Sequence, residues 1–192
     1  MHYVVGLADQ TETALKAWEK LLFGEAAVGS LANGGYSNGE SGTSRLIRTV
    51  CKTVQTRGCE KSGRVQDFAA FLTVELGFPS VPLIPFKGNR FNILFYNGGM
   101  CYYLRDHLNS FLSEVNEENK LFKAVHHDLE VSAFIAACRA LGFINKFVTG
   151  PLWSLLESEV HILKMNQHYQ HMEELFNKYA EDATSIMKGD VM

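Results

Sequence analysis

Apolar residues recur every three or four positions along most of this chain, a pattern that predicts α-helices as the main element. The pattern begins in a helix over about 11–23, which Thr11 or Thr13 can cap and Gly24 can end. Its apolar positions share one face, and such a face normally packs against a core. They are Ala14, Leu15, Trp18, Leu21 and Leu22.

Glycine, serine and asparagine dominate the stretch over 25–43, which favours a flexible loop. Ser44 then begins a second predicted helix that Gly58 ends, and a third helix is predicted over about 65–76, before Gly77. The apolar stripe of the second helix consists of Leu46, Ile47, Val50 and Val54.

Three prolines, Pro79, Pro82 and Pro85, predict an extended path, because proline fixes φ and disfavours helix in the preceding residue. We expect a sub-boundary near 78–90. The apolar run that follows is too short for periodicity to separate strand from helix. We predict a short extended or strand segment near 91–96, broken by Asn97-Gly98-Gly99.

The second half of the chain again shows helical periodicity. Asp128 is predicted to cap one helix that stops at Gly142, and Gly150-Pro151 forms the clearest break. No glycine or proline follows until after Met187, which predicts one long C-terminal helix. The predicted helices of this half cover about 100–115, 118–127, 129–141 and 152–187.

These elements predict a mainly α fold: an irregular multi-helix bundle with one short extended segment and a long C-terminal helix. The chain of 192 residues is 46% apolar and 20% charged, within the ordinary globular range. We expect a single helical domain over 1–192.

The net charge of −3 is unevenly distributed. Eight Lys and Arg face three Asp and Glu over 43–90, whereas three Lys face seven acids over 151–192. The basic middle indicates a DNA or RNA surface, or two regions of one chain that attract each other. Lys87 and Arg90 lie among aromatic residues, and cations with aromatics suit phosphates and unpaired bases. The candidate nucleic-acid residues are Arg45, Arg48, Lys52, Lys87 and Arg90.

Three histidines, His161, His168 and His171, lie near one face of the predicted C-terminal helix. Their spacing permits a metal site, although solvent-facing histidines without a metal are the commoner outcome of such spacing. In His126-His127-Asp128 the two adjacent rings diverge by about 100° and cannot face one substrate. We predict no catalytic residues, no bound metal and no cofactor.

The four cysteines form no CxxC pair, which favours reduced, buried thiols. The N-terminal residues show no basic segment followed by a long apolar run, as a signal peptide would. We find no run of about 18 apolar residues, the length that a membrane helix needs. We therefore expect a nuclear or cytoplasmic protein without a membrane partner.

Two segments carry a family resemblance: His2-Tyr3-Val4-Val5-Gly6-Leu7-Ala8 and Asn89-Arg90-Phe91-Asn92. They resemble pieces of hAT-type transposases, in which a Cys-x-x-His segment precedes a helical insertion and an Arg-Trp motif follows. His2 would match the motif histidine and Arg90 the motif arginine, while Phe91 replaces the tryptophan. The motif cysteine would lie before Met1, and no match to the family's metal-binding carboxylates is identified. The resemblance therefore implies a fragment without catalytic activity.

Two functions follow as hypotheses. The first is a non-catalytic, transposase-derived helical domain that retains DNA or RNA binding. The second is a helical protein-interaction or oligomerisation module that uses the 152–187 helix for self-association or for a protein partner.

Overall fold

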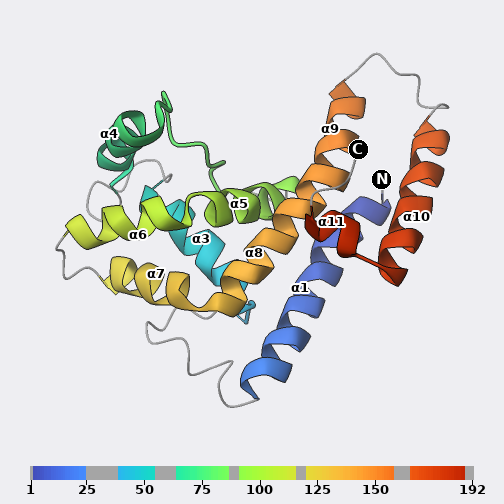
Figure 1. The fold of residues 1–192 in the computed structure, drawn as a ribbon, viewed down its shortest axis with the longest axis horizontal. Coiled ribbons are helices and arrows are strands. Elements are labelled where there is room, and N and C mark those ends of the chain that lie inside the picture. The colour runs from blue at the N-terminus through green and yellow to red at the C-terminus, as the bar shows by residue number, and fades with distance from the viewer. Residues whose placement is uncertain are drawn as a thin grey trace. The chain divides into compact units, whose positions relative to one another are not determined.

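The computed structural model describes residues 2–24, 39–54, 64–86, 91–115, 120–157 and 165–188. All regular elements in these ranges are helical (Figure 1), which confirms the mainly α prediction. The chain divides into two compact units, Met1–Gly142 and Phe143–Met192. The single domain over 1–192 stays a prediction, and the proposed sub-boundary near 78–90 lies inside the first unit.

Helix α3, Gly42–Val54, forms the centre of the first unit. It contacts α1 (His2–Phe23), α4 (Val65–Leu76), α5 (Phe91–Tyr103) and α7 (Lys120–Glu130). Figure 1 shows it passing between α5 and α7. All its residues are buried except Arg48, which is half-buried, and Lys52, which is exposed. The predicted stripe of four apolar residues lies in the core.

The polar residues of α3 satisfy their hydrogen bonds inside this core. Thr49 donates its hydroxyl to the carbonyls of Arg45 and Leu46, and Thr53 donates to the carbonyl of Thr49. Such bonds to the preceding turn remove the cost of burying a hydroxyl. Ser41, and not Ser44 as predicted, caps the helix, because the Ser41 hydroxyl accepts the Ser44 N–H at 3.1 Å.

Helix α4 and the proline-containing segment after it agree with the sequence predictions. Helix α4 covers Val65–Leu76 as predicted and ends at Gly77, whose φ of 70° is left-handed. The proline-containing segment from Pro79 to Phe86 is non-helical, as expected. Most of the predicted loop over 25–43 lies outside the described residues, and α3 begins at Gly42.

The predicted strand near 91–96 is wrong, since α5 runs without interruption from Phe91 to Tyr103. The Asn97-Gly98-Gly99 break is therefore wrong as well. Asn97 is fully buried, and its side chain takes the place of a strand partner for Ile84. It accepts the Ile84 N–H at 2.9 Å and donates to the Ile84 carbonyl at 2.8 Å. An asparagine typical of turns here secures the extended segment to the core.

The glycines of α5 and α8 mark a helix crossing. Helix α8, Ser132–Ile144, continues past Gly142, where the sequence predicted a stop. A Cβ on Gly142 would lie 2.8 Å from the Gly99 Cα, and one on Gly98 would lie 2.7 Å from the Leu141 Cβ. Only glycine allows the two backbones to approach this closely, so the apparent helix breakers are packing positions.

Helices α6, Arg105–Glu114, and α7 complete the first unit. The predicted N-cap role of Asp128 is wrong, because Asp128 lies within α7 and the chain breaks at Val131 instead. Aspartate is a frequent helix cap, which is why the sequence predicted this role. In the structure the Asp128 carboxylate instead accepts a hydrogen bond from the buried Arg45 of α3.

In the second unit the predicted break at Gly150-Pro151 is wrong. A π-helical turn, η1 (Asn145–Thr149), leads directly into α9 (Gly150–Glu157). The Gly150 N–H bonds to the Asn145 carbonyl, and a Cβ on Gly150 would lie 2.8 Å from that oxygen. The wider turn accommodates Pro151, which has no N–H to donate to the preceding turn.

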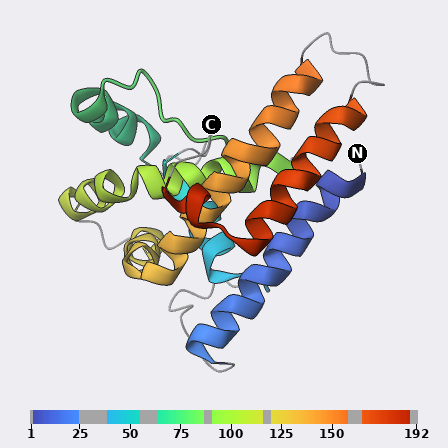
Figure 2. The same ribbon diagram turned by 45° about the vertical axis from the view of Figure 1, so that its right-hand side comes forward.

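The prediction of one uninterrupted helix to about 187 is also wrong. Helix α10, Met165–Glu181, ends before a break at Asp182 and Ala183, and α11 covers Thr184–Lys188. Asp182 accepts the Thr184 N–H at 2.8 Å, and hydrogen bonds from Thr184 lower the pKa of its carboxyl. This cap ends one helix and begins the next. Figure 2 shows α10 and α11 from a second direction.

Candidate interaction surfaces

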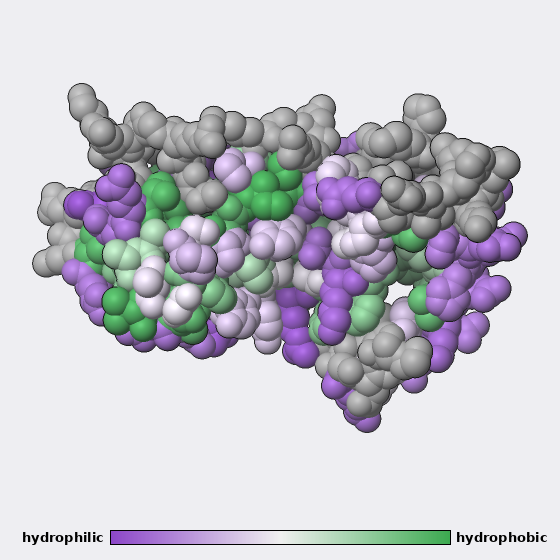
Figure 3. All heavy atoms as spheres, turned by 90° about the horizontal axis from the view of Figure 1, so that it is seen from above, coloured by the Kyte–Doolittle hydropathy of each residue, from purple (hydrophilic) through white to green (hydrophobic). Residues whose placement is uncertain are grey.

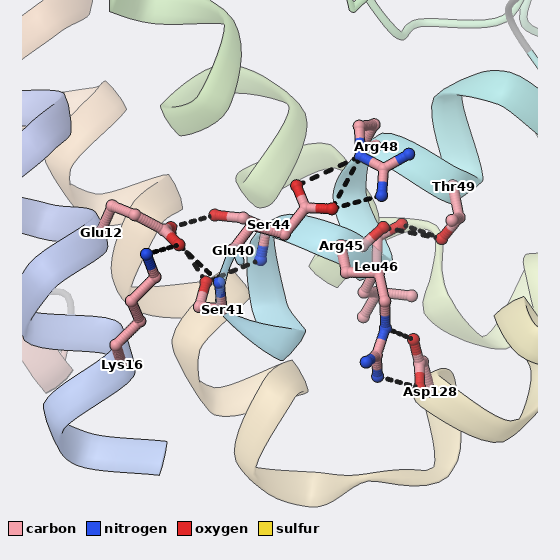
Figure 4. Close-up of polar contacts among 10 residues, drawn as sticks. All are labelled: Glu12, Lys16, Glu40, Ser41, Ser44, Arg45, Leu46, Arg48, Thr49 and Asp128. Atoms are coloured by element: carbon pink, nitrogen blue, oxygen red, sulfur yellow. Dashed lines mark hydrogen bonds and ion pairs between the residues drawn. The ribbon is translucent and has the colours of Figure 1, made fainter. Parts of the chain in front are cut away.

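The predicted nucleic-acid residue Arg45 lies in the core of the first unit. Its guanidinium holds the Asp128 carboxylate through two hydrogen bonds, Nε to Oδ2 at 3.0 Å and Nη2 to Oδ1 at 2.9 Å (Figure 4). Both side chains are less than 10% exposed. This paired, two-pronged geometry joins α3 to α7 and does not present Arg45 to a phosphate.

Of the other four predicted basic residues, the structure describes Arg48 and Lys52. Arg48 forms an ion pair with Glu40, and its side chain is 12% exposed. Lys52 is exposed on α3. Lys87 and Arg90 lie outside the described residues. Nucleic-acid binding through Arg48, Lys52, Lys87 and Arg90 stays a prediction.

The histidine face of the C-terminal region is only partly described. His168 and His171 are exposed on α10, and His161 lies outside the described residues. In the described part of the chain, no group of three His, Cys, Asp or Glu is arranged to hold a metal ion. The His127 Nδ1 lies 3.5 Å from Asp128 Oδ1, but that carboxylate already holds Arg45.

Three thiols from three helices are buried in the first unit: Cys51, Cys101 and Cys138. Burial raises the pKa of Cys51 to about 12. Burial and, to a smaller extent, the charge of Glu19 raise the pKa of Cys138 to about 12. Burial likewise raises the pKa of Cys101 well above its ordinary value. Thiols this strongly protonated are poor nucleophiles, and the predicted reduced, buried state is confirmed for these three.

Helix α1 is held to α3 by two carboxylates. Glu19 is 2% exposed and accepts the Gly42 N–H at 2.7 Å, the Thr43 N–H at 3.0 Å and the Thr43 hydroxyl at 2.8 Å. Seven residues earlier, Glu12 accepts the Ser41 N–H and hydroxyl at 2.5 and 3.0 Å (Figure 4). Acids are favourable at a helix N-terminus because its free N–H groups carry partial positive charge.

This attachment turns the apolar stripe of α1 away from the core. Of the five residues predicted to share the packed face, only Leu15 is buried. Leu21 is 83% and Leu22 is 50% exposed, and Trp18 is half-buried. Ala14 and Ala17 are also exposed. We name Ala14, Ala17, Trp18, Leu21 and Leu22 the outward face of α1.

The sequence contained one sign that the apolar stripe of α1 faces solvent and not the core. Glu12 and Glu19 lie seven residues apart, on the same side of the helix as Leu15. Hydrophobic periodicity predicts that such acids face solvent. It cannot reveal that the buried N–H groups of Ser41 to Thr43, at the N-terminus of α3, donate hydrogen bonds to them.

A second apolar face lies on α10. Tyr169 is 36% and Phe176 is 47% exposed, and Met172 and Tyr179 are half-buried. Their spacing of three and four residues is typical of a helix that pairs with another helix. The sequence predicted that the 152–187 helix binds a partner, and for α10, which lies within that range, this role stays a prediction.

Hydrophobic residues also reach the surface elsewhere, and Figure 3 shows them interspersed with hydrophilic ones on one side of the molecule. The exposed large apolar residues of α4, α5 and the segment between them are Val74, Tyr102, Tyr103 and Phe86.

One helical stretch of the described chain, Ser132–Leu155, is long and apolar enough to cross a membrane, with a mean hydropathy of 1.2. The sequence shows no uninterrupted run of about 18 apolar residues here, whereas the structure joins this stretch into continuous helix across Gly142 and Gly150. Length and composition alone are weak support for a span, and Phe134, Ile135 and Leu141 of this stretch belong to the core of the first unit.

Comparisons of the chain with protein-family models, curated protein sequences and solved structures gave no match. The resemblance to hAT-type transposases therefore stays a prediction.

Proposed function

We propose that this protein is a helical oligomerisation module whose chains associate through the outward face of α1. The observation that supports this proposal is the orientation of α1. Its acids face inward to cap α3, and its apolar residues face solvent. Isolated exposed leucines are ordinary, but an apolar stripe along one helix is typical of a surface that another protein covers.

Two features make this face suitable for a partner helix. Ala14 and Ala17 are small enough for a second helix to approach closely, and Trp18 and Leu21 supply apolar area beside them. The inward carboxylates fix the rotation of α1, so the stripe is presented in one orientation before a partner arrives. Such preorganisation reduces the entropy lost on binding.

Sedimentation velocity over a concentration series tests the proposal. We expect the wild-type chain to sediment as a concentration-dependent oligomer and Leu21→Glu to sediment as a monomer. Val74→Glu is a matched control, since Val74 on α4 is also 83% exposed. A wild-type monomer at all concentrations, or equal effects of the two variants, would contradict the proposal. Circular dichroism confirms that each variant remains folded.

The exposed apolar face of α10 supports a second candidate within the same function. If α10 carries the association, Phe176→Glu abolishes the oligomer and Leu21→Glu leaves it unchanged. Phe176 is 47% exposed, so its replacement leaves the folded chain intact. The two variants in one assay therefore separate the two faces.

A further inference from the structure

Tyrosine side chains reach solvent along one side of α5, away from the helix faces that the proposed function uses. Tyr102 is 41% and Tyr103 is 54% exposed, and Tyr96 is half-buried. Tyr96 and Tyr103 are seven residues apart, so they lie on the same face of the helix. Tyr102 lies about 100° round the helix from Tyr103, on the side of α8.

Two neighbouring elements extend this side of α5. From α8, the Arg139 guanidinium carbon lies 5.8 Å from the centre of the Tyr102 ring, which is the distance of a cation–π contact. From the segment after α4, the half-buried Phe78 ring lies 6.4 Å from the Tyr103 ring, measured between ring centres. We name Phe78, Tyr96, Tyr102, Tyr103 and Arg139 the aromatic surface of α5.

Positive charge without acids is the second feature of this surface. The stretches that build it, 76–104 and 131–142, contain no Asp or Glu, although the whole chain has a net charge of −3. Their cations are Lys87, Arg90 and Arg139. Lys87 and Arg90 lie outside the described residues, and only Arg139 is placed by the structure. Aromatic rings together with an excess of positive charge suit a polyanion that also carries flat rings.

We propose that the aromatic surface of α5 binds single-stranded nucleic acid, with unpaired bases stacked on Tyr102 and Tyr103 and the phosphates near the cations. Every base has a flat π face, so such stacking tolerates different base sequences. Tyr102 keeps 41% exposure although Arg139 lies over its ring, so a base can still reach it. This inference goes beyond the proposed function, because it uses neither α1 nor α10.

Duplex DNA and a membrane fit this surface less well. In a duplex the bases are stacked on one another, whereas unpaired bases can be splayed out onto aromatic side chains. Helices that lie on a membrane carry Trp, Phe or Leu on the side that enters the bilayer. The most exposed side chains of the aromatic surface are tyrosines, whose hydroxyls are polar.

Fluorescence anisotropy of the full chain with a labelled oligothymidylate tests this proposal. Tyr102→Ala and Tyr103→Ala should each raise the dissociation constant about five- to a hundredfold. Tyr103→Phe keeps the ring and should stay within about twofold of the wild type. Tyr169→Ala is the matched control, since Tyr169 on α10 is 36% exposed. An abasic oligonucleotide of the same length should bind at least about tenfold more weakly, because it offers phosphates without bases.

Three results would overturn the proposal. They are equal affinity for the abasic and the thymidine oligonucleotide, alanine variants that bind as tightly as the wild type, and no binding at low salt. Binding to vesicles of phosphatidylserine and phosphatidylcholine, but to no oligonucleotide, would assign the surface to a membrane instead. Both tyrosines are exposed, so their replacement leaves the core intact, and circular dichroism confirms the fold of each variant.

Discussion

Glu19 of α1 accepts two hydrogen bonds from Thr43 of α3, one from its N–H at 3.0 Å and one from its hydroxyl at 2.8 Å. The carboxylate is 2% exposed, and the Gly42 N–H is its third donor. One side chain thus caps a buried helix from a distance of 24 residues. It also determines which face of α1 remains outside.

Removing the charge of Glu19 should therefore destabilise the fold. We expect Glu19→Gln to lower the free energy of unfolding by roughly 1–3 kcal/mol, because an amide makes weaker bonds to the Gly42 and Thr43 N–H groups. Urea denaturation measures the change. Glu75→Gln is the control, since Glu75 is exposed on α4. Equal midpoints for the two variants would show that the cap contributes nothing.

The buried pair Arg45–Asp128 should be strongly coupled. Arg45→Met and Asp128→Leu each leave one buried charge without its partner, and we expect each to cost roughly 3–5 kcal/mol. The double variant should cost much less than the sum of the two. A double-mutant cycle by chemical denaturation measures this coupling. Additive costs would mean that the two residues stabilise the core independently.

The crossing of α5 and α8 should not tolerate a methyl group. Gly142→Ala places a Cβ 2.8 Å from the Gly99 Cα, and we expect a loss of about 1–3 kcal/mol in thermal or urea denaturation. Gly6→Ala is the matched control, because Gly6 lies in α1 with nothing within 4 Å of an added Cβ. That change should leave stability unchanged or raise it by up to about 1 kcal/mol, owing to the better helix propensity of alanine. The prediction fails if both substitutions behave alike.

Asn97 should control the segment from Pro79 to Phe86. Asn97→Ala removes both hydrogen bonds to Ile84, so we expect faster hydrogen exchange at the amides of this segment and a loss of about 1–3 kcal/mol. Mass-spectrometric hydrogen exchange resolves the segment from α5. Asn177→Ala on the exposed side of α10 provides the control. Unchanged exchange in the segment would show that the prolines alone determine its path.

The predicted nucleic-acid surface can be tested without Arg45, which belongs to the core. We expect Lys52→Ala, Lys87→Ala and Arg90→Ala each to weaken binding to labelled DNA and to reduce the salt dependence of that binding. Fluorescence anisotropy over a salt series measures both. Glu75→Gln again serves as the control. Binding that is undetectable at low salt would remove this function.

The sequence by itself determined the helical class and much of the helix placement. Helix α4 and its Gly77 stop, the apolar stripe of α3 and the proline-containing extended segment follow from local rules, because each depends on residues close in sequence. The buried thiols also follow from composition. For the candidate site, sequence periodicity found the apolar stripe of α1 but assigned it to the wrong side of the molecule.

Only the tertiary structure decided the role of the residues that do not follow these local rules. Gly99 and Gly142 appear as helix breakers until their backbones meet, and Asn97 appears as a turn residue until Ile84 lies beside it. Arg45 and Glu19 resemble surface charges until Asp128 and the N-terminus of α3 pair with them. The physical reason is the same in each case. A glycine, an amide or a charge gains its favourable environment from a distant segment, and the cost of burial disappears only once that segment is in place.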